Sequence, residues 1–318
     1  MRTYVLKRLL YAIPTIFGIT VLIFGIMRIL PGDPLGAYYG IETIIQWTPE
    51  QKAAILRDLG LDKPIAVQYA VWMKDIASGK LGESFFRGDP IINILAQRGP
   101  ISAQIGIISV AISWIIGLPV GIISAVRPNS IWDMFTSFFT VLFLAIPGFW
   151  LGLLVVVACI SWFQYKAPIV SVQFWEDPWT NFQIIVGPAI VLGLGQAAFI
   201  ARMARSSLFE VLREDYVRTS RAKGLIERLV IARHAMPNAL LPVLTLSGVL
   251  LGFVMGGSVA VEQAFTVPGV GKALVVAAID RDFNVVQNIV LFYAVIFVMV
   301  NLLIDLLYGW LDPRIRLN

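Results

Sequence analysis

The sequence is poor in charge, in cysteine and in histidine. Only 14% of its 318 residues are Asp, Glu, Lys or Arg, whereas about 25% is usual in a soluble globular domain. A soluble chain of this length would lack the charged side chains needed to cover its surface, and lipid is the surface that needs none. The single cysteine, Cys159, excludes an internal disulfide and a cysteine-based metal site, and the single histidine, His234, removes most histidine-centred catalysis.

Long apolar runs take the place of charge. The hydrophobic fraction is 58% and the mean hydropathy is +0.80. A helix needs about 20 mainly apolar residues to cross the hydrocarbon core of a bilayer. Six stretches meet or approach that length, at residues 9–30, 101–126, 134–163, 184–201, 239–261 and 288–311. The sequence therefore predicts an all-α polytopic membrane protein with six transmembrane helices, the first of which stays as an anchor because its run is too long for a cleaved signal peptide.

Two charges fall inside these stretches, Arg28 and Asp305. Both lie near a predicted helix end, where a long or flexible side chain reaches the membrane interface. We favour this interpretation over a functional charge within the membrane.

The basic residues are distributed unevenly among the loops. With the N-terminus placed in the cytoplasm, the cytoplasmic segments hold fourteen Lys and Arg residues and the two short outer loops hold three. Membrane proteins carry this excess on the cytoplasmic side. We therefore predict that both termini are cytoplasmic, and we interpret the net charge of +5 as a mark of orientation and not of nucleic-acid binding.

Helix-breaking and polar residues within the spans leave two interpretations open. Proline and glycine, as at Pro119 and Pro147-Gly148, indicate either broken helices around a path or tight helix packing. Glu262 lies at a helix end, and we favour an interface or gate residue over an ion ligand. Four polar residues of the later spans either line a path or bond to carbonyls within the bundle: Gln196, Thr245, Ser247 and Ser258.

The most polar part of the chain is the cytoplasmic segment 202–238. Gly224 interrupts its helical pattern, so we expect two short helices joined at a turn. Acid–base pairs four residues apart support these helices: Glu214 with Arg218, and Lys223 with Glu227. Beyond the glycine we expect an apolar stripe of Leu225, Leu229 and Ala232. The segment is either a docking element for a partner protein or a basic face on the lipid headgroups.

One motif of this segment is specific. Residues 215–224 read DYVRTSRAKG, and nine residues separate Gly224 from His234-Ala235-Met236-Pro237. The pattern resembles the cytoplasmic loop of the permease subunits of ATP-binding-cassette importers, in the dipeptide/oligopeptide/nickel branch. Ile226 departs from the small or polar residue that is usual there. Further motifs follow the order of that family, namely LPGDP at 30–34, LGLDKPIAVQYAVWMKDIASGKLGESF at 59–85, VEQAFTVPGVGKAL at 261–274 and LDPRIR at 311–316.

This resemblance implies a fold and an assembly. The fold would be that of a type I importer permease, similar to the methionine importer permease, in a prokaryotic plasma (inner) membrane. A second homologous permease subunit would complete the pore, and an extracytoplasmic solute-binding protein would deliver a peptide or a related small solute. Two ATP-binding cassette subunits, which hold the ATP and Mg²⁺, would dock below on a coupling helix that includes Glu214, Asp215, Tyr216, Arg218, Thr219, Arg221, Ala222, Lys223 and Gly224.

The chain itself lacks the motifs of an ATPase. Gly271-Lys272 looks like the end of a phosphate-binding loop, but Thr266 occupies the position of its first glycine and Ala273 follows the lysine. We therefore predict that this chain is not an enzyme and holds no cofactor or metal of its own. An ion-coupled carrier or channel is the alternative, disfavoured because no acid pair lies in the middle of a span. A membrane-embedded enzyme lacks a catalytic cluster.

Three regions are expected. Residues 1–30 form the N-terminal segment and first span, residues 31–99 an extracytoplasmic loop or small helical region, and residues 100–318 a five-helix permease core with the coupling loop 202–238. The long first loop is a candidate contact for the binding protein. The solute is left open among dipeptides, oligopeptides, nickel chelates, heme, glutathione and sugars.

Overall fold

The computed structural model describes residues 2–29, 47–58, 60–85 and 87–311. Its helices follow in the order α1 (Arg2–Ile29), α4 (Pro49–Asp58), α5 (Ile65–Ala77), α6 (Ile91–Val126), α7 (Ile131–Ala145), α8 (Gly148–Phe163), α9 (Pro178–Val211), α10 (Asp215–Ala222), α11 (Glu227–Leu229), the π-helical segment η1 (Val230–Ala235), α12 (Met236–Ala264), α13 (Val270–Ile279) and α14 (Phe283–Leu311). One isolated antiparallel bridge joins Glu83 to Pro90.

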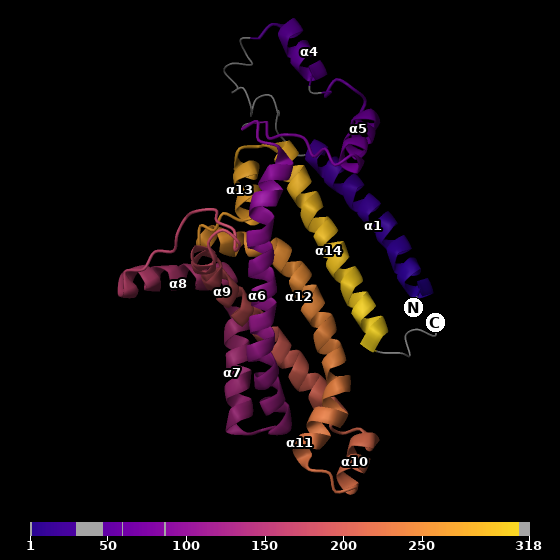
Figure 1. Ribbon diagram of the computed structural model, residues 1–318, viewed down its shortest axis with the longest axis vertical. Coiled ribbons are helices and arrows are strands. Elements are labelled where there is room, and N and C mark those ends of the chain that lie inside the picture. The colour runs from indigo at the N-terminus through magenta and orange to yellow at the C-terminus, as the bar shows by residue number, and fades with distance from the viewer. Residues whose placement is uncertain (1, 30–46, 59, 86, 312–318) are drawn as a thin grey trace.

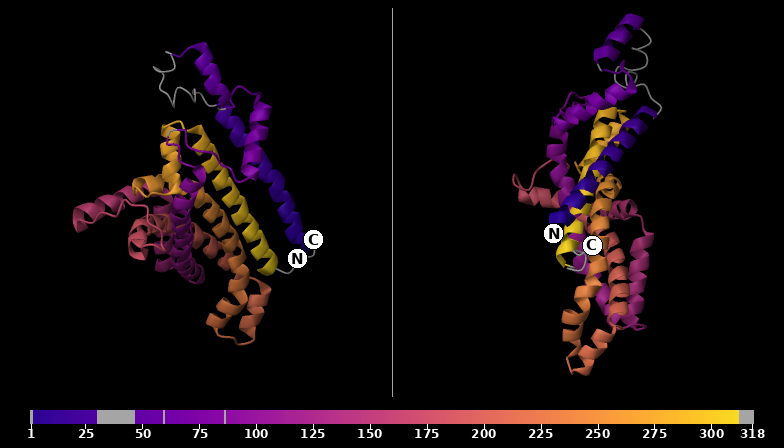
Figure 2. Two further views of the ribbon diagram at one scale, coloured as in Figure 1. Left: turned by 45° about the horizontal axis from the view of Figure 1, so that its top comes forward. Right: turned by 90° about the vertical axis from the view of Figure 1, so that its right-hand side faces the viewer.

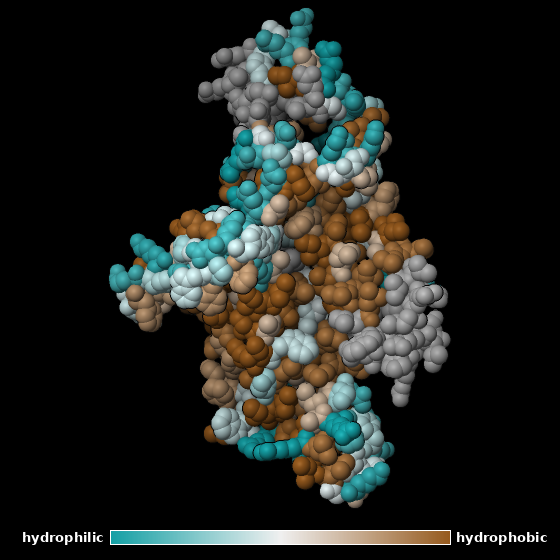
Figure 3. Space-filling model, viewed as in Figure 1, coloured by the Kyte–Doolittle hydropathy of each residue, from teal (hydrophilic) through white to brown (hydrophobic). Residues whose placement is uncertain are grey.

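The long helices run between two ends of the molecule, which we name the α4 end (α4, α5, α13 and residues 78–90) and the α10 end (α10, α11 and the turn between α6 and α7) (Figure 1). Within the described residues, five continuous helices are long and apolar enough to cross a membrane: α1, α6, α9, α11 through α12, and α14. A hydrophobic band covers the middle of the visible face, and hydrophilic residues gather at both ends (Figure 3). The start of α1 and the end of α14 lie on the same side of the molecule (Figure 1), in agreement with the prediction for the termini.

The sixth pass differs from the prediction. Residues 134–163 do not form one straight span, because α7 and α8 meet at a bend of 95°. Ile146 takes an extended conformation at φ −85° and ψ 120°, since the residue before a proline is disfavoured in the α region. Helix α8 therefore leaves the bundle sideways (Figures 1 and 2). Of the two interpretations left open for proline, the broken helix applies at Pro147, while Pro119 lies inside an uninterrupted α6.

Close packing of α6 against α9 forms the centre of the bundle. A Cβ atom on Gly117 would lie 2.6 Å from the carbonyl oxygen of Ala197, and one on Gly121 would lie 2.5 Å from that of Ala201. Such distances admit only glycine, and small residues at helix contacts are the usual means of packing in lipid. The apolar part of α9 is 61% buried and that of α1 only 17%, so α9 lies at the centre and α1 at the edge.

Several helices extend beyond the apolar runs. Helix α6 begins at Ile91, before the predicted boundary at residue 99, and α9 continues ten residues past Ala201 to Val211. The additional helical turns contain polar residues, so a search for apolar runs does not detect them. Asp177 is the N-cap of helix α9, and its carboxylate accepts hydrogen bonds from the backbone N–H groups of Trp179 and Thr180.

Candidate functional site

The candidate docking element is the α10 platform, which we define as residues 214–227. It forms the tip of the α10 end, outside the hydrophobic band (Figures 1 and 3). Val217 anchors it, since this side chain is fully buried in a cluster with Ala125 of α6, Leu208 of α9, and Val230, Ala235 and Ala239. The platform is therefore packed against three of the long helices and is not a loose connector.

Arg221 joins the platform to both neighbouring helices. Its guanidinium donates hydrogen bonds to both carboxylate oxygens of Glu227, at 2.7 and 3.1 Å, and to the carbonyl oxygen of Leu212 at 3.2 Å. These bonds to Glu227 raise the pKa of Arg221, so the cation persists across the physiological range. At the other side of α10, Asn238 donates to the hydroxyl of Tyr216 at 2.8 Å. The platform is therefore bonded both to the end of α9 and to the start of α12.

The chain after Gly224 departs from the prediction. Gly224 takes the left-handed φ of +78° that ends α10, but no separate second short helix follows, because α11, η1 and α12 continue without a break from Glu227 to Ala264. The predicted stripe is also shifted, since Ala232 is exposed and the buried positions are Val230 and Ala235. The hydrogen bonds of a π-helix join residues five apart, whereas those of an α-helix join residues four apart. The spacing of buried residues expected for an α-helix therefore does not hold in η1.

The predicted docking residues are presented outward. The side chains of Asp215, Arg218, Thr219, Ala222 and Lys223 are exposed. Arg218 pairs with Asp215 at 3.5 Å, and Arg221 rather than Lys223 pairs with Glu227, so both predicted acid–base pairs are replaced by others. Glu214 begins the helix as its exposed N-cap.

Ile226 is a surface residue that sequence reasoning noted only as a departure from the family pattern. It is 71% exposed beside Gly224 at the tip. An exposed isoleucine among charged side chains is a candidate apolar contact for a partner, and the only signal in the sequence was its departure from the family pattern.

A partly buried clamp connects the α10 end to α7. Arg205 of α9 donates to both carboxylate oxygens of Asp133, at 2.9 and 3.0 Å, and to the hydroxyl of Ser124 at 2.8 Å. Ser124 at the end of α6 also donates to Asp133. Asp133 is 5% exposed, and its N–H bonds to Ser130, the N-cap of α7. Sequence reasoning missed this clamp of Ser124, Asp133 and Arg205, and the Ser130-x-x-Asp133 capping pattern was its only signal.

Glu262 forms a latch at the α4 end. Its side chain is fully buried, and its carboxylate accepts hydrogen bonds from Ser102 at 2.8 Å and Ser258 at 3.2 Å. The other oxygen accepts from the backbone N–H groups of Gly271 and Lys272, at 2.9 and 3.3 Å, in the first turn of α13. A carboxylate at a helix N-terminus is stabilised by the helix dipole, so this latch fastens α6, α12 and α13 together.

The remaining candidates for the path are positioned differently. Gln196 lines a cavity of about 310 Å³ between the α7–α8 bend, α9 and α12, whose walls are otherwise apolar. Its amide donates to Ser109 at 3.4 Å, and its carbonyl oxygen has no partner in the part of the chain that the structure describes. Ser247 accepts from Trp114 at 2.7 Å between helices. Thr245 is exposed and donates to the carbonyl oxygen of Leu241.

Two family matches together cover almost the whole chain. Residues 117–317 match the binding-protein-dependent transport system inner membrane component, and residues 1–106 match the N-terminal part of such a membrane component. The chain is 37% identical over 339 residues to the dipeptide transport system permease protein DppB of Escherichia coli K12, with 99% of each chain covered. It is 36% identical to the DppB of Alkalihalophilus pseudofirmus, covering 99% of this chain and 100% of that one.

Solved structures resemble the fold. The inward-facing methionine ABC transporter MetNI superposes with a TM-score of 0.57 at 20% identity, covering 70% of this chain and 98% of that chain. An amino acid ABC transporter crystallised with histidines gives a TM-score of 0.52 at 12% identity, with 67% and 92% covered. At these identities the likeness concerns the fold alone, and it confirms the predicted all-helical permease fold.

Proposed function

The chain belongs to the family of binding-protein-dependent transport system inner membrane components, and on that premise we propose that it is a permease subunit of an ATP-driven importer for peptides. Its full-length relatives are named as dipeptide transport permeases. The chain forms one half of the translocation path, and separate subunits supply the ATP hydrolysis.

The observation that carries this proposal is the α10 platform. It is a short helix at the tip of a membrane bundle, held by a buried core and by Arg221 on its inner side, with charged and small side chains facing out. A helix presented in this way fits a groove on a partner. The platform is where the ATP-binding subunits dock on the cytoplasmic side.

The connections of the platform explain how docking reaches the path. Movement of the platform is transmitted directly into α12 through the unbroken α11–η1 segment. It also reaches α7 through the end of α9, because Arg205 ties α9 to Asp133. The α7–α8 bend and Gln196 line the same cavity. Closure of the ATPase subunits thus biases two arrangements of the bundle, which is the basis of alternating access.

The remaining partners contact other surfaces. Helix α8 leaves the bundle with large exposed apolar side chains, among them Phe149, Leu153 and Val157, and a surface of that kind is covered by lipid or by a second permease subunit. The α4 end, with its polar helices, receives the solute-binding protein on the outer side. A path of this kind requires no cofactor in the chain itself.

Site-specific cross-linking tests the docking role. In a background of Cys159→Ser, Thr219→Cys on α10 is expected to cross-link to an ATPase subunit of the assembled transporter. Ala53→Cys, on exposed α4, is the matched control and should cross-link to none. Cross-linking from Ala53 but not from Thr219 would reverse the orientation and contradict the proposal. Solute uptake that persists after removal of the ATPase subunits would instead favour an ion-coupled carrier or channel.

A further inference from the structure

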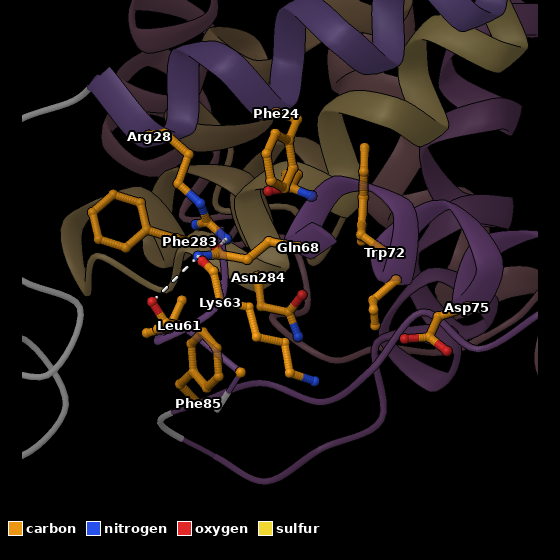
Figure 4. A pocket seen from close by; sticks show the side chains of 13 residues that line it. Phe24, Arg28, Leu61, Lys63, Gln68, Trp72, Asp75, Phe85, Phe283 and Asn284 are labelled. Carbon is orange, nitrogen blue, oxygen red and sulfur yellow. Dashed lines mark hydrogen bonds between the residues drawn. The ribbon is translucent and has the colours of Figure 1, made fainter. Parts of the chain in front are cut away.

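A second cavity, apart from the path, lies at the α4 end between α1, α5 and the start of α14 (Figure 4). Its volume is about 340 Å³. The walls combine aromatic rings with cationic and amide side chains, namely Phe24, Trp72, Phe85 and Phe283 with Arg28, Lys63, Gln68, Asn284 and Gln287. Nothing in the transport mechanism above uses this site.

Arg28 supplies the main positive charge of the cavity. Its guanidinium lies 4.8 Å from the centre of the Phe24 ring and donates to the side-chain oxygen of Gln68 at 2.7 Å. It forms no ion pair with any residue in the described part of the chain. Asp75 is the acidic residue among those that line the cavity, and its carboxylate lies apart from Arg28 (Figure 4). The cavity thus holds two cations, Arg28 and Lys63, against one acid.

Gln287 points to an absent ligand. It lines the same cavity, and only 6% of its surface is exposed. Its amide makes no hydrogen bond with any residue that the structure describes, and its polar atoms are not among the fully enclosed atoms that lack a partner. The amide is therefore open to the cavity, where an oxygen-rich ligand would accept hydrogen bonds from its N–H donors.

The position of the cavity along the membrane normal and the residues around it indicate the class of ligand. Arg28 is the penultimate described residue of α1, at the outer end of its apolar run, and this is the level of the lipid phosphates in the orientation assigned above. Below it, α1 carries large apolar side chains that are between 45% and 64% exposed: Phe17, Val21, Leu22 and Ile26. An acyl chain lying along that surface would continue from a headgroup at Arg28.

We propose that this cavity binds the phosphate group of an outer-leaflet phospholipid. Arg28 and Lys63 balance its charge, the amide of Gln287 donates to a phosphate oxygen, and the rings of Phe24 and Phe283 contact the glycerol and the first acyl carbons. An arginine held in place by Gln68 and Phe24 is already oriented for a phosphate, which favours bidentate binding. The bound lipid fixes α1 and α5 against α14.

Native mass spectrometry of the full-length chain, titrated with phosphatidylglycerol, tests this site. The wild type should retain one lipid more tightly than the rest. Arg28→Gln should weaken that binding roughly tenfold or more, as expected for loss of a charge-assisted hydrogen bond. Gln287→Leu should weaken it by a smaller factor, and Arg28→Lys should keep most of it. Arg57→Gln, an exposed arginine of α4 outside the cavity, is the matched control and should change nothing.

Three results would overturn the proposal. The first is lipid retention that neither Arg28→Gln nor Gln287→Leu reduces. The second is displacement of the lipid by inorganic phosphate or glycerol 1-phosphate at similar concentration, because the site would then select a free anion. The third is loss of the retained lipid when the chain assembles with its partner permease, because a protein would then occupy the site. If Arg28→Gln fails to fold, the lipid affinity of Gln287→Leu and the competition with free phosphate still show whether the cavity binds a phospholipid.

Discussion

The two ends of the bundle are fastened by different chemistry. At the α10 end, the bond between Arg221 and Glu227 joins side chains that are 40% and 52% exposed. At the α4 end, the carboxylates of Glu262 and Asp282 are 0% and 2% exposed and accept hydrogen bonds from neutral donors, such as Ser102, Ser84 and backbone N–H groups. The latch at the α4 end therefore depends on buried carboxylates, and the α10 platform on an ion pair in contact with water, beside the clamp of Arg205 with the buried Asp133.

From this difference we expect the latch to resist displacement more than the α10 platform does. A buried carboxylate that loses its donors keeps the full cost of desolvation, so the latch resists any change in the positions of α6, α12 and α13. An exposed ion pair that opens is rehydrated and loses little. The platform can thus change its contacts when a partner docks, while the latch keeps α6, α12 and α13 together at the opposite end.

The largest effect is expected from breaking the latch. Glu262→Leu leaves two hydroxyl groups and two backbone N–H groups without their acceptor, and because each unsatisfied buried donor costs about 1–3 kcal/mol, the chain should be destabilised by about 3–5 kcal/mol after partial relaxation. Glu262→Gln, which keeps one acceptor oxygen, should cost less. Thermal unfolding in detergent measures both. Glu50→Gln, an exposed acid of α4, is the control, and an equal loss in Glu50→Gln and Glu262→Leu would contradict a special role for the latch.

A smaller loss is expected from the clamp. Arg205→Gln should cost about 2–4 kcal/mol, less than a fully buried pair because the arginine side chain is 43% exposed. The loss of stability in Arg205→Lys should be smaller than that in Arg205→Gln but not zero, since an ammonium group keeps the charge and cannot bond bidentately to Asp133. A double-mutant cycle of Arg205→Gln with Asp133→Asn checks the pair. If the two single losses simply add, the two residues do not act together.

The smallest change in stability is expected from Arg221→Gln. The ion pair between Arg221 and Glu227 is exposed, so its removal should lower the free energy of unfolding by about 0.2–1 kcal/mol. This loss of stability should become smaller as salt is added. The same substitution should reduce uptake by the assembled transporter much more than it lowers the unfolding temperature. A large loss of stability that is independent of salt would mean that the platform is as rigid as the latch.

The sequence predicted elements more successfully than contacts. Apolar runs located the five continuous spans, and the DYVRTSRAKG motif located α10, because both signals are local. The bend after Ile146 was left open as one of two interpretations of Pro147-Gly148, since hydropathy does not register a change of direction within an apolar run. Both fasteners were missed for another reason: Arg205 bonds to Asp133 across 72 residues, and Ser102 to Glu262 across 160. Only the fold brings such partners together.

The π-helical segment shows a third kind of failure. Because its turn is wider than an α-helical turn, Ala235 is buried where Ala232 was expected to be. No pattern in the sequence indicated a π-helix at this place. Since π-turns often mark functional segments, its position between the platform and α12 agrees with transmission of movement at this end.

Uptake per ATP hydrolysed in reconstituted transporters measures whether the α10 platform couples ATP hydrolysis to the path. Ala222→Glu places a charge on the outer face of α10 without touching the core of the bundle, and Ala53→Glu places the same charge on α4. We expect Ala222→Glu to lower uptake per ATP roughly tenfold or more, as for the loss of a contact at the centre of an interface, while Ala53→Glu keeps the wild-type ratio. An unchanged ratio in Ala222→Glu, with the subunits still assembled, would contradict the account.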